Sequence, residues 1–412
     1  MTGHQAGFWH PGILAKYIAA DRLAERIGGT GAAVVVDHDV VDPLRLEAVR
    51  VSGDGSVERA VVLLGGSRRK AVLPRLADPM RRAELHQPGE GLMKTDAAAM
   101  EAIIAALSEH EGATSLGEQV ARANADLLKD WMSVSMFSAQ QMVRTSGWKR
   151  FFEMAVKDAP GCAKAYNRAV GSHPEAGIPR LFAMAREHRW ELPFWMLDRE
   201  HGRRVLYAEM VEQEGFDEDL LATRAMSLTA SVRRDLCDLF IHGVGGAIYD
   251  RATDVWIREW LGEELAPTVS ITADVRRAIP VDARRNATDE DLAWAKWIVH
   301  SARHNPELLG EPAAAETKHG LLERIEATEH GSLQRAELYR EMHRGLEEVR
   351  ARRSRELKGL ARTAHEMEQG LEVRALEAKR DWPSVMYERE RLEELADRIG
   401  WLISAAPRPA RR

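Results

Sequence analysis

Three short stretches of the chain carry side chains that can exchange protons or bind an anion. The first is MTGHQAGFWHPG at residues 1–12, whose candidate residues are Gly3, His4, Gln5, Gly7, His10 and Gly12. A glycine-rich loop that leads into a helix leaves backbone N–H groups free, which suits an anion such as phosphate. Histidines beside it could bind phosphate oxygens or protonate a leaving group near neutral pH. The alternative is a structural turn in which Phe8 and Trp9 simply pack into the core.

The second stretch is Asp37-His38-Asp39, which follows the apolar run AAVVV at residues 32–36. Ligands of open α/β sheets bind just outside the carboxyl ends of the strands. If the strand continues, alternation places Asp37 and Asp39 on one face and His38 on the other. The carboxylates could hold Mg²⁺ or a substrate amine, or they could orient a histidine. The alternative is a solvated cap at the end of the strand.

The third stretch is HGVGG, with His242, Gly243, Gly245 and Gly246, followed by Tyr249. Its glycines would let a ligand approach the backbone amides that open the next helix. As a motif it is only half of a dinucleotide fingerprint, and a tight turn is the alternative. Arg224 is a further candidate anion clamp, for which the alternative is an ordinary surface arginine.

These three stretches gain weight together, because each carries His with Gly or Asp and the second and third follow predicted strands. In a parallel sheet their loops can converge at one edge, where a ligand cleft would form. A metal site built from the histidines is conceivable, but their spacing matches no metal-binding signature, so we predict none. The histidines in question are His4, His10, His38 and His242.

The elements that position these residues follow a doubly wound α/β rhythm of loop, helix and buried strand. We predict a loop at the N-terminus that leads into a helix ending at Gly28-Gly29, and the first strand at AAVVV. Further strands are predicted at VSMFSA (134–139), before HGVGG and at TVSITAD (268–274), with hairpins at 46–65 and around Gly202. No strand leads into the N-terminal loop, so we expect either that the sheet lacks that strand or that the recorded start is too late.

Beyond residue 285 the pattern becomes helical and rich in charge. An apolar seam steps by three and four residues, as in a coiled coil, through Leu357, Leu360, Ala364, Met367 and Leu371. We predict a Rossmann-like core at 1–285, a helical region with a coiled-coil arm at 286–404 and a disordered tail at 405–412. The arm could form a homodimer, or it could fold back on itself and bury the same seam.

Composition excludes several classes of protein. The 412 residues carry a formal charge of −6, which gives no support to nucleic acid as the main partner. Cys162 and Cys237 are far apart and form neither a zinc motif nor a disulfide framework, so we expect a reducing, cytoplasmic compartment. No apolar run approaches the roughly 20 residues that a membrane helix needs, and no signal peptide is visible. We therefore predict a small-molecule substrate, with no membrane partner.

Taken in order, these stretches resemble the bacillithiol-biosynthesis cysteine-adding enzyme family. That family has a Gly-Gln-Gln-x-Gly loop before a long helix, where this chain has GHQAG at residues 3–7. It has an acidic residue before Asp-His-Asp, where this chain has Val36, and a Gly-Pro-Gly turn followed by tyrosine, where this chain has GVG and Tyr249. The segment ATRAM is similar to the family's Thr-Arg-Pro segment, and RDWPSVMYERERLEEL is also similar to this family.

The resemblance implies a Rossmann-like core similar to nucleotidylyltransferases, with a helical coiled coil. It implies an activity that joins cysteine to a glucosaminyl-malate acceptor. His4 stands where the family has glutamine and His10 where it has threonine, so a different acceptor is an open alternative. The pair His10 and Gly12 also approaches the phosphate-binding pattern of nucleotidylyltransferases.

Our leading hypothesis is a ligase or transferase of this type. As catalytic residues, His4 and His10 would lie near the phosphate or carboxylate of a substrate, and Asp37, His38 and Asp39 would bind the amine or act in proton transfer. His242 and the amides that follow it would bind an anion, and Gln5, the glycines, Arg224 and Tyr249 are the further substrate-binding candidates. One alternative is a nucleotidylyltransferase-type enzyme that uses ATP or CTP. Another is a non-catalytic interaction protein with a coiled-coil arm. The residues do not identify a cofactor; ATP or another nucleotide with Mg²⁺ is the candidate.

Overall fold

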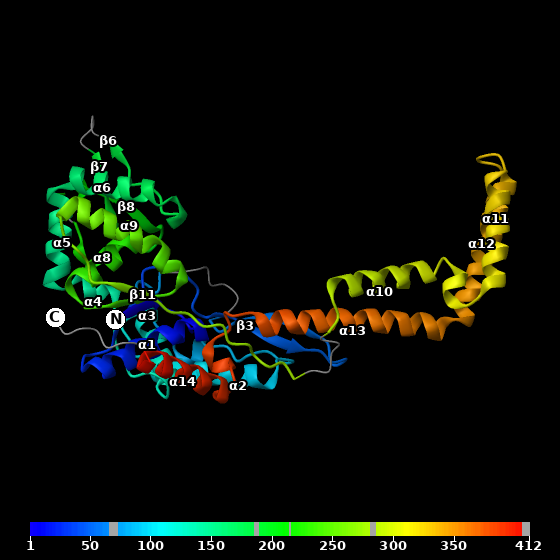
Figure 1. Ribbon diagram of the computed structural model, residues 1–412, viewed down its shortest axis with the longest axis horizontal. Coiled ribbons are helices and arrows are strands. Elements are labelled where there is room, and N and C mark those ends of the chain that lie inside the picture. The colour runs from blue at the N-terminus through cyan, green and yellow to red at the C-terminus, as the bar shows by residue number, and fades with distance from the viewer. Residues whose placement is uncertain (66–72, 185–188, 214–215, 281–285, 406–412) are drawn as a thin grey trace. The chain divides into compact units, whose positions relative to one another are not determined.

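The computed structural model in Figure 1 describes residues 1–65, 73–184, 189–213, 216–280 and 286–405. The chain divides into two compact units. The first comprises Met1–Arg50, Arg59–Ala278 and the described residues from Lys379 onward, and the second comprises Val51–Glu58 and Ile279–Ala378. Among the described residues, no helix is long and apolar enough to cross a membrane.

A five-stranded, wholly parallel sheet lies at the centre of the first unit. Its strands are β1 (Thr2–Gln5), β2 (Ala32–Val36), β5 (Ser135–Ser138), β10 (Phe240–His242) and β11 (Thr268–Ser270). Their order is β11-β10-β1-β2-β5, so the chain winds from β1 to one edge and then returns to wind toward the other. The order reverses between β1 and β10, which is where a doubly wound sheet binds its ligand. The predicted α/β class with a Rossmann-like parallel core is confirmed.

The expectation that the sheet lacks a strand ahead of the glycine-rich loop was wrong. Residues Thr2–Gln5 form β1, the central strand, which pairs with β2 from Thr2↔Ala33 to Gln5↔Val36 and with β10 at Thr2↔Ile241. Gly3 is required by close packing, since an ideal Cβ there would lie 2.5 Å from Cγ1 of Val34. A four-residue strand of small and polar residues carries no alternating pattern, so the sequence hid it.

Two helices leave the sheet at the order reversal. Helix α1 (Pro11–Ile27) follows β1 and ends at Gly28, whose φ of 70° lies in the left-handed region that glycine adopts freely. Helix α9 (Val244–Leu261) follows β10 and ends at Gly262 with a φ of 69°. The N-termini of both helices therefore point toward the carboxyl edge of the sheet.

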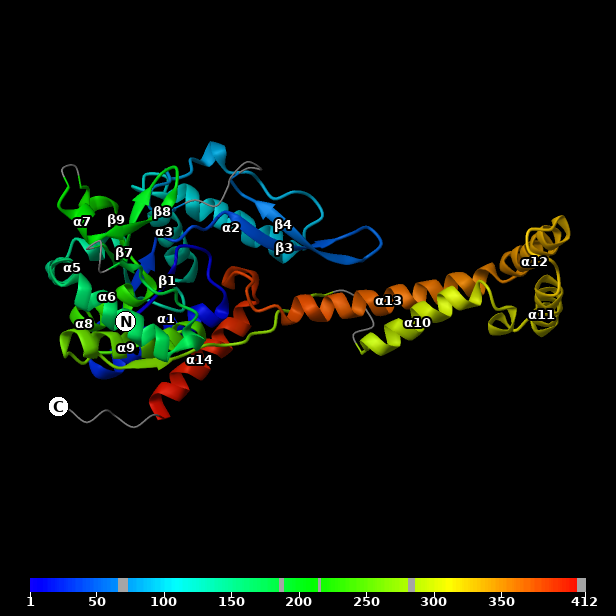
Figure 2. The same cartoon turned by 90° about the horizontal axis from the view of Figure 1, so that it is seen from above.

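The remaining elements of the first unit cover the sheet and its edges (Figures 1 and 2). The helices are α2 (Lys94–Glu109), α3 (Leu116–Leu128), α4 (Ala139–Val143), α5 (Ser146–Lys157), α6 (Ala159–Ser172), α7 (Ala208–Val211), α8 (Ala225–Asp235) and α14 (Arg389–Ala405). A second, antiparallel sheet contains β6 (Ala183–Met184), β7 (Arg189–Asp198), β8 (Gly202–Tyr207) and β9 (Leu221–Thr223). Both predicted hairpins are present: β7 pairs with β8, and β3 (Arg45–Val51) pairs with β4 (Val57–Leu63).

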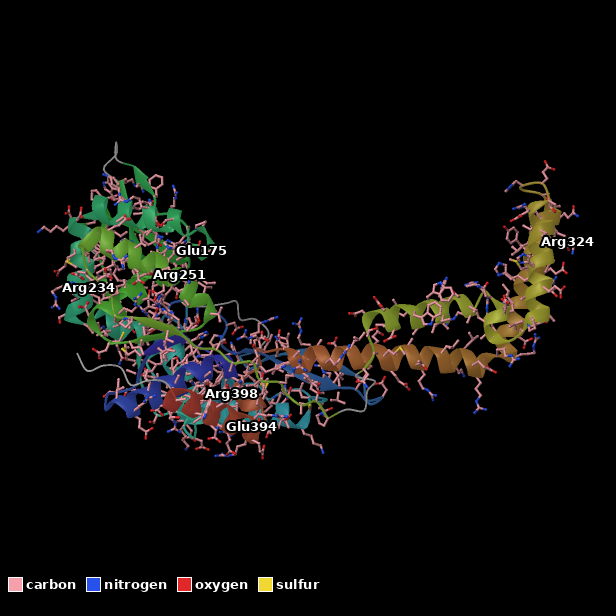
Figure 3. The ribbon with its side chains drawn as sticks, in the orientation of Figure 1. Glu175, Arg234, Arg251, Arg324, Glu394 and Arg398 are labelled. Carbon is pink, nitrogen blue, oxygen red and sulfur yellow. The ribbon has the colours of Figure 1, made fainter. Side chains whose placement is uncertain are left out.

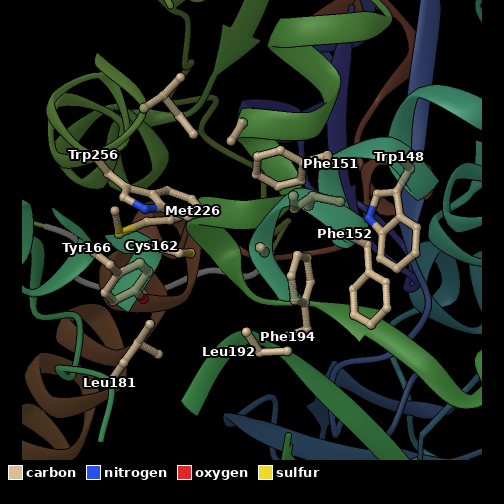
Figure 4. Packing of buried hydrophobic residues seen from close by; sticks show 14 of the residues in the cluster. Trp148, Phe151, Phe152, Cys162, Tyr166, Leu181, Leu192, Phe194, Met226 and Trp256 are labelled. Atoms are coloured by element: carbon tan, nitrogen blue, oxygen red, sulfur yellow. The ribbon is translucent and has the colours of Figure 1, made fainter. Parts of the chain in front are cut away.

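An aromatic core fixes α9 against its neighbours. Phe151 makes edge-to-face contacts with Phe194 and with Trp256, at centroid distances of 6.1 and 6.0 Å. Trp256 of α9 also meets Tyr166 of α6 edge-to-face at 5.3 Å, as Figure 4 shows. Aromatic pairs in these geometries add to the stability gained by area burial alone. The N-terminus of α9 therefore extends from a rigidly packed helix.

The second unit is helical. It contains α10 (Asp289–Ala302), α11 (Pro312–Glu326), α12 (Leu333–Arg352) and α13 (Ser354–Ala378). Helix α10 lies alongside α13 and α11 alongside α12 (Figures 1 and 2). Charged side chains such as Arg324 project outward from these helices (Figure 3).

The apolar stripes of the second unit, the predicted seam among them, are covered at least in part within the chain. One stripe of α11 and α12 closes into a cluster of Leu321, Ile325, Leu338, Met342 and Leu346. The seam residues Leu357 and Leu360 pack beside Ala302, Leu309 and Val349. This arrangement corresponds to the alternative in which the arm folds back on itself. A coiled-coil homodimer through the arm stays a prediction.

The structure groups α14 with the first unit, whereas the predicted boundary at residue 285 assigned it to the helical region. The reason is tertiary: α14 packs along α1, and the backbone N–H and hydroxyl of Ser384 both donate to the carbonyl of Trp9 at 2.7 Å. Of the predicted tail, residues 406–412 lie outside the described residues.

Candidate functional site

A cavity of about 540 Å³ opens at the carboxyl ends of β1, β2 and β10. Its volume lies within the range of small-molecule sites. Among the predicted site residues, all except Asp37 and Gly7 line it. Lining residues that were not predicted include three with charged side chains, Lys16, Arg203 and Arg380, and the aromatic Trp195.

Asp37 lies outside this cavity, which corrects its place in the candidate site. Strand β2 ends at Val36, so the alternation expected for Asp37, His38 and Asp39 does not apply. Asp37 is 2 % exposed, and its Oδ1 accepts from Nε and Nη2 of Arg75 at 3.0 and 2.9 Å. Burial raises the pKa of Asp37, but the hydrogen bond from His38 and the charge of Arg75 outweigh it and lower the pKa overall. Asp37 thus forms a buried ion pair with Arg75 and also contacts His38, which lines the cavity.

Gly7 lies beyond the end of β1 and lines a different, smaller cavity of about 320 Å³ with Phe8 and Asp42. An ideal Cβ on Gly7 would meet nothing within 4 Å, so its position does not require glycine.

His10 forms the N-cap of α1. Its Nδ1 accepts from the backbone N–H of Gly12 at 3.0 Å, so the ring proton of the neutral imidazole must be on Nε2. Burial, with the nearby charge of Arg380, lowers the pKa of His10. An ideal Cβ on Gly12 would lie 2.8 Å from Cε1 of His10 and from the carbonyl of Ala273, so only glycine fits there. Neutral His10 at the N-terminus of α1 can therefore donate a hydrogen bond through Nε2.

The hydrogen bond of His242 leaves its acceptor nitrogen, rather than its donor nitrogen, without a partner among the described residues. Its Nε2 lies 3.0 Å from Oδ2 of Asp250, which also accepts from Nη1 of Arg233 at 2.9 Å. Burial raises the pKa of Asp250, but the hydrogen bond from His242 and the charges of His242 and Arg233 outweigh it and lower the pKa overall. Ionised Asp250 can only accept, so Nε2 of His242 donates, and Nδ1 of the neutral ring is left as an acceptor. The two histidines thus present one donor and one acceptor, as a general acid and a general base would.

Lys16 and His4 lie deeper in the cavity. Lys16 is 4 % exposed and donates from Nζ to the carbonyl of Gly3 at 2.8 Å. Burial lowers the pKa of Lys16 to about 8, and burial together with Lys16 lowers the pKa of His4 to about 3. Lys16 interrupts the apolar run ILAKYIAA of α1, and that charged residue on a buried face was the signal from which it could have been found.

The antiparallel sheet supplies the opposite wall. Asp39 accepts from Nη1 of Arg203 at 2.6 Å and from Nε2 of Gln5 at 3.1 Å. The guanidinium of Arg224 stacks over Trp195, 3.7 Å from the ring centroid, and forms an ion pair with Glu191. Sequence alone gave no signal for Trp195 or Arg203.

Four cationic side chains line the cavity: Lys16, Arg203, Arg224 and Arg380. Arg203 forms an ion pair with Asp39, Arg224 with Glu191 and Arg380 with Asp274, so Lys16 is the one of the four without a carboxylate partner among the described residues. The first turn of α9 adds backbone N–H groups that have no acceptor within the helix. In the part of the chain that the structure describes, no group of three or more His, Cys, Asp or Glu side chains is arranged to hold a metal ion. Lys16, which has no carboxylate partner among the described residues, and these amides of α9 favour a ligand that carries negative charge.

No family model matches this chain. No curated protein matches it either. Among solved structures, it is weakly similar to one from Campylobacter jejuni that bears the name "putative arginyl t-RNA synthetase". The identity is 10 %, the TM-score is 0.28, and the match covers 98 % of this chain and 92 % of that one. At this TM-score the similarity carries no argument about the fold or function of this chain.

Proposed function

We propose that this chain is an enzyme of the ligase or transferase class, which joins an amino acid to an amino-sugar-type acceptor. The observation that carries the proposal is the cavity at the order reversal of the sheet, where His10 and His242 offer a donor and an acceptor. Condensation of an amine with an activated carboxyl group needs a base to take the amine proton and an acid to serve the leaving group. The resemblance noted in the sequence supports cysteine as the amino acid.

The roles of individual residues belong to this proposal. Asp39 would hold the substrate amine, because a carboxylate accepts from ammonium groups and this one lies at the cavity wall. His38 would orient the ligand from the end of β2. Arg224 and Arg380 would bind carboxylate or phosphate oxygens, for which guanidinium groups are well suited.

Nucleotidyl transfer is the second candidate function. It is supported by the strand order, with the reversal between β1 and β10 and a helix N-terminus on each side. This is the geometry in which α/β sheets bind nucleotide phosphates. In that case ATP or CTP, with Mg²⁺, would be the co-substrate.

One assay separates these functions. The full chain is incubated with cysteine, an amino-sugar acceptor, and ATP or CTP with Mg²⁺, and both the condensed thiol and released pyrophosphate are measured. Thiol product supports the ligase or transferase, and pyrophosphate without that product supports nucleotidyl transfer. Formation of either product should be lost in His10→Ala. It should be kept in His110→Ala, because His110 pairs with Asp126 of α3 and does not line the cavity. If no product forms and none of these compounds raises the melting temperature, the chain is a non-catalytic protein and the proposal fails.

A further inference from the structure

The ammonium group of Lys16 is buried without a counter-charge. It is 4 % exposed, and among the described residues its one hydrogen-bond acceptor is the carbonyl of Gly3. No carboxylate in the described part of the chain forms an ion pair with it, and burial alone accounts for its lowered pKa. A buried charge is costly unless it is paired, and an ammonium can donate three hydrogen bonds. Lys16 therefore has unused donors and an uncompensated charge next to a cavity.

Two other groups with unused hydrogen-bonding capacity line the same cavity. Nδ1 of His4 is buried and has no hydrogen-bond partner among the described residues. The stem of Lys16 passes Gly243, the N-cap of α9, since an ideal Cβ there would lie 3.9 Å from Cδ of Lys16. Helix α9 begins at Val244 without a side-chain cap in the described structure, so its first N–H groups are free.

We propose that Lys16, His4 and the first turn of α9 form a seat for an oxyanion group of the substrate. The group is a phosphoryl or a carboxylate group, because both present several acceptor oxygens and negative charge. The free amides of α9 and the positive end of its dipole would bind the same oxygens that Lys16 neutralises. This inference deepens the proposed function and rests on it, since it names the chemical class that the same cavity recognises.

The seat also explains an otherwise unfavourable choice of residue. Methionine would fill the place of Lys16 on the apolar face of α1 without a desolvation cost. A lysine that only supported the fold would be expected to have a carboxylate partner, as Arg75 has in Asp37. Lys16 instead lies where two helix N-termini and two strand ends meet.

The test uses the full chain and two simple anions, inorganic pyrophosphate and succinate, at fixed ionic strength. Affinity is measured by calorimetry and by the ligand-induced rise in melting temperature. Lys16→Met should weaken binding of the accepted anion by about tenfold or more, as the loss of a charge-assisted hydrogen bond predicts. Lys157→Met, at an exposed lysine of α5, should leave the affinity unchanged. Wild-type preference for pyrophosphate assigns a phosphoryl group to the seat, and preference for succinate assigns a carboxylate.

A second pair of variants probes α9 without touching Lys16. Val244→Pro removes one amide donor at the first helical position, where proline is well tolerated. Leu333→Pro makes the same change at the first position of α12. We expect Val244→Pro to weaken anion binding several-fold while it keeps the melting temperature, and Leu333→Pro to leave binding unchanged.

Two outcomes would overturn the seat: neither anion binds to the wild type, or both Lys16→Met and Val244→Pro bind the anion as the wild type does. Because these measurements need no turnover, they are independent of the assay for the proposed function. Anion binding that depends on Lys16 in a chain without enzymatic activity would uphold the seat and reject the enzyme. Turnover in a chain whose anion binding is unchanged by both Lys16→Met and Val244→Pro would support the enzyme and reject the seat.

Discussion

At the scale of single residues, the hydrogen-bond partner of each histidine decides which ring nitrogen carries the proton. The Gly12 amide fixes the proton of His10 on Nε2, and ionised Asp250 fixes the proton of His242 on Nε2 as well. The first ring can therefore donate through Nε2, whereas the second can accept only through Nδ1. Nδ1 of His242 lies against Gly246, where an ideal Cβ would approach it to 2.4 Å.

A glycine of α9 and one of α11 offer a test of His242. Gly246→Ala places a methyl group against Nδ1 and displaces the ring from Asp250, whereas Gly320→Ala in α11, outside the cavity, meets nothing within 4 Å. We expect Gly246→Ala to lower turnover by roughly 10²-fold, the contribution typical of a positioned acid or base. Gly320→Ala should keep activity and raise stability by at most about 1 kcal/mol, because alanine favours the helix. Equal activities of the two variants would contradict a role for His242 in proton transfer.

Lys16 should make the stability of the free protein depend on pH. Its folded pKa of about 8 lies below the ordinary value of 10.5, so between these values the unfolded chain holds more protons. The free energy of unfolding should therefore rise with pH in that window, and the penalty is present in full below it. His4 and His10, which interact with Lys16, have lowered pKa values and stay neutral throughout.

The measurement is urea unfolding of the wild type and of Lys16→Met at about pH 7 and pH 10.5. We expect Lys16→Met to be the more stable protein at the lower pH, by up to about 3 kcal/mol from the pKa difference. That advantage should disappear at the higher pH. A Lys16→Met protein that is less stable at both values would mean that the lysine supports the fold.

At the scale of elements, the polar residues that follow β2 make different contacts: Asp37 pairs with Arg75, and Asp39 lies at the cavity wall. Asp37 turns behind the sheet to Arg75, whose Nη1 also donates to the carbonyl of Leu221 at 2.7 Å. His38 and Asp39 line the cavity, and Nδ1 of His38 also lies 3.3 Å from Nη2 of Arg75 and 3.6 Å from Oδ1 of Asp37. The segment after Val36 thus carries one residue that stabilises the fold and others that line the cavity. We therefore expect Asp37 and Asp39 to differ in how their substitution affects stability and activity.

Asp37→Asn and Asp39→Asn separate these tasks. Asp37→Asn leaves buried Arg75 without its counter-charge, and breaking such a pair costs about 3–5 kcal/mol. Asp39→Asn removes a charge that is partly exposed, so its effect on stability should be below about 1 kcal/mol. Chemical denaturation measures both values, and the product assay should show the larger loss per folded molecule for Asp39→Asn. The reverse pattern would contradict this division.

At the scale of the whole molecule, the chain leaves the first unit at Ala278 and re-enters it at Lys379. The returning segment contributes Arg380 to the cavity, where it donates to Oγ1 of Thr272 at 2.8 Å, and Ser384 to the loop that carries Trp9. A monomer mass in solution at micromolar concentration would rule out the predicted homodimer through the arm.

Because the second unit closes its own apolar clusters, the first should fold without it. We expect a chain in which residues 286–376 are replaced by a Gly-Ser linker to fold and to bind the preferred anion within about threefold of the wild type. Far-ultraviolet circular dichroism and calorimetry check these two points. A linker that begins at the same place but ends after residue 384 removes Arg380 and Ser384, and it should lose both folding cooperativity and binding.

The sequence by itself determined the elements whose patterns are local. Apolar runs and glycine turns located β2, β5, β10 and both hairpins. The rule that ligands bind at the carboxyl ends of parallel strands brought the three candidate stretches together. It did not reveal β1, because four small and polar residues become a strand only when two neighbours supply hydrogen bonds. It could not assign Asp37 to a buried ion pair or bring Lys16, Arg203 and Arg380 to one cavity. These facts depend on contacts between residues far apart in the chain, which only the tertiary structure creates.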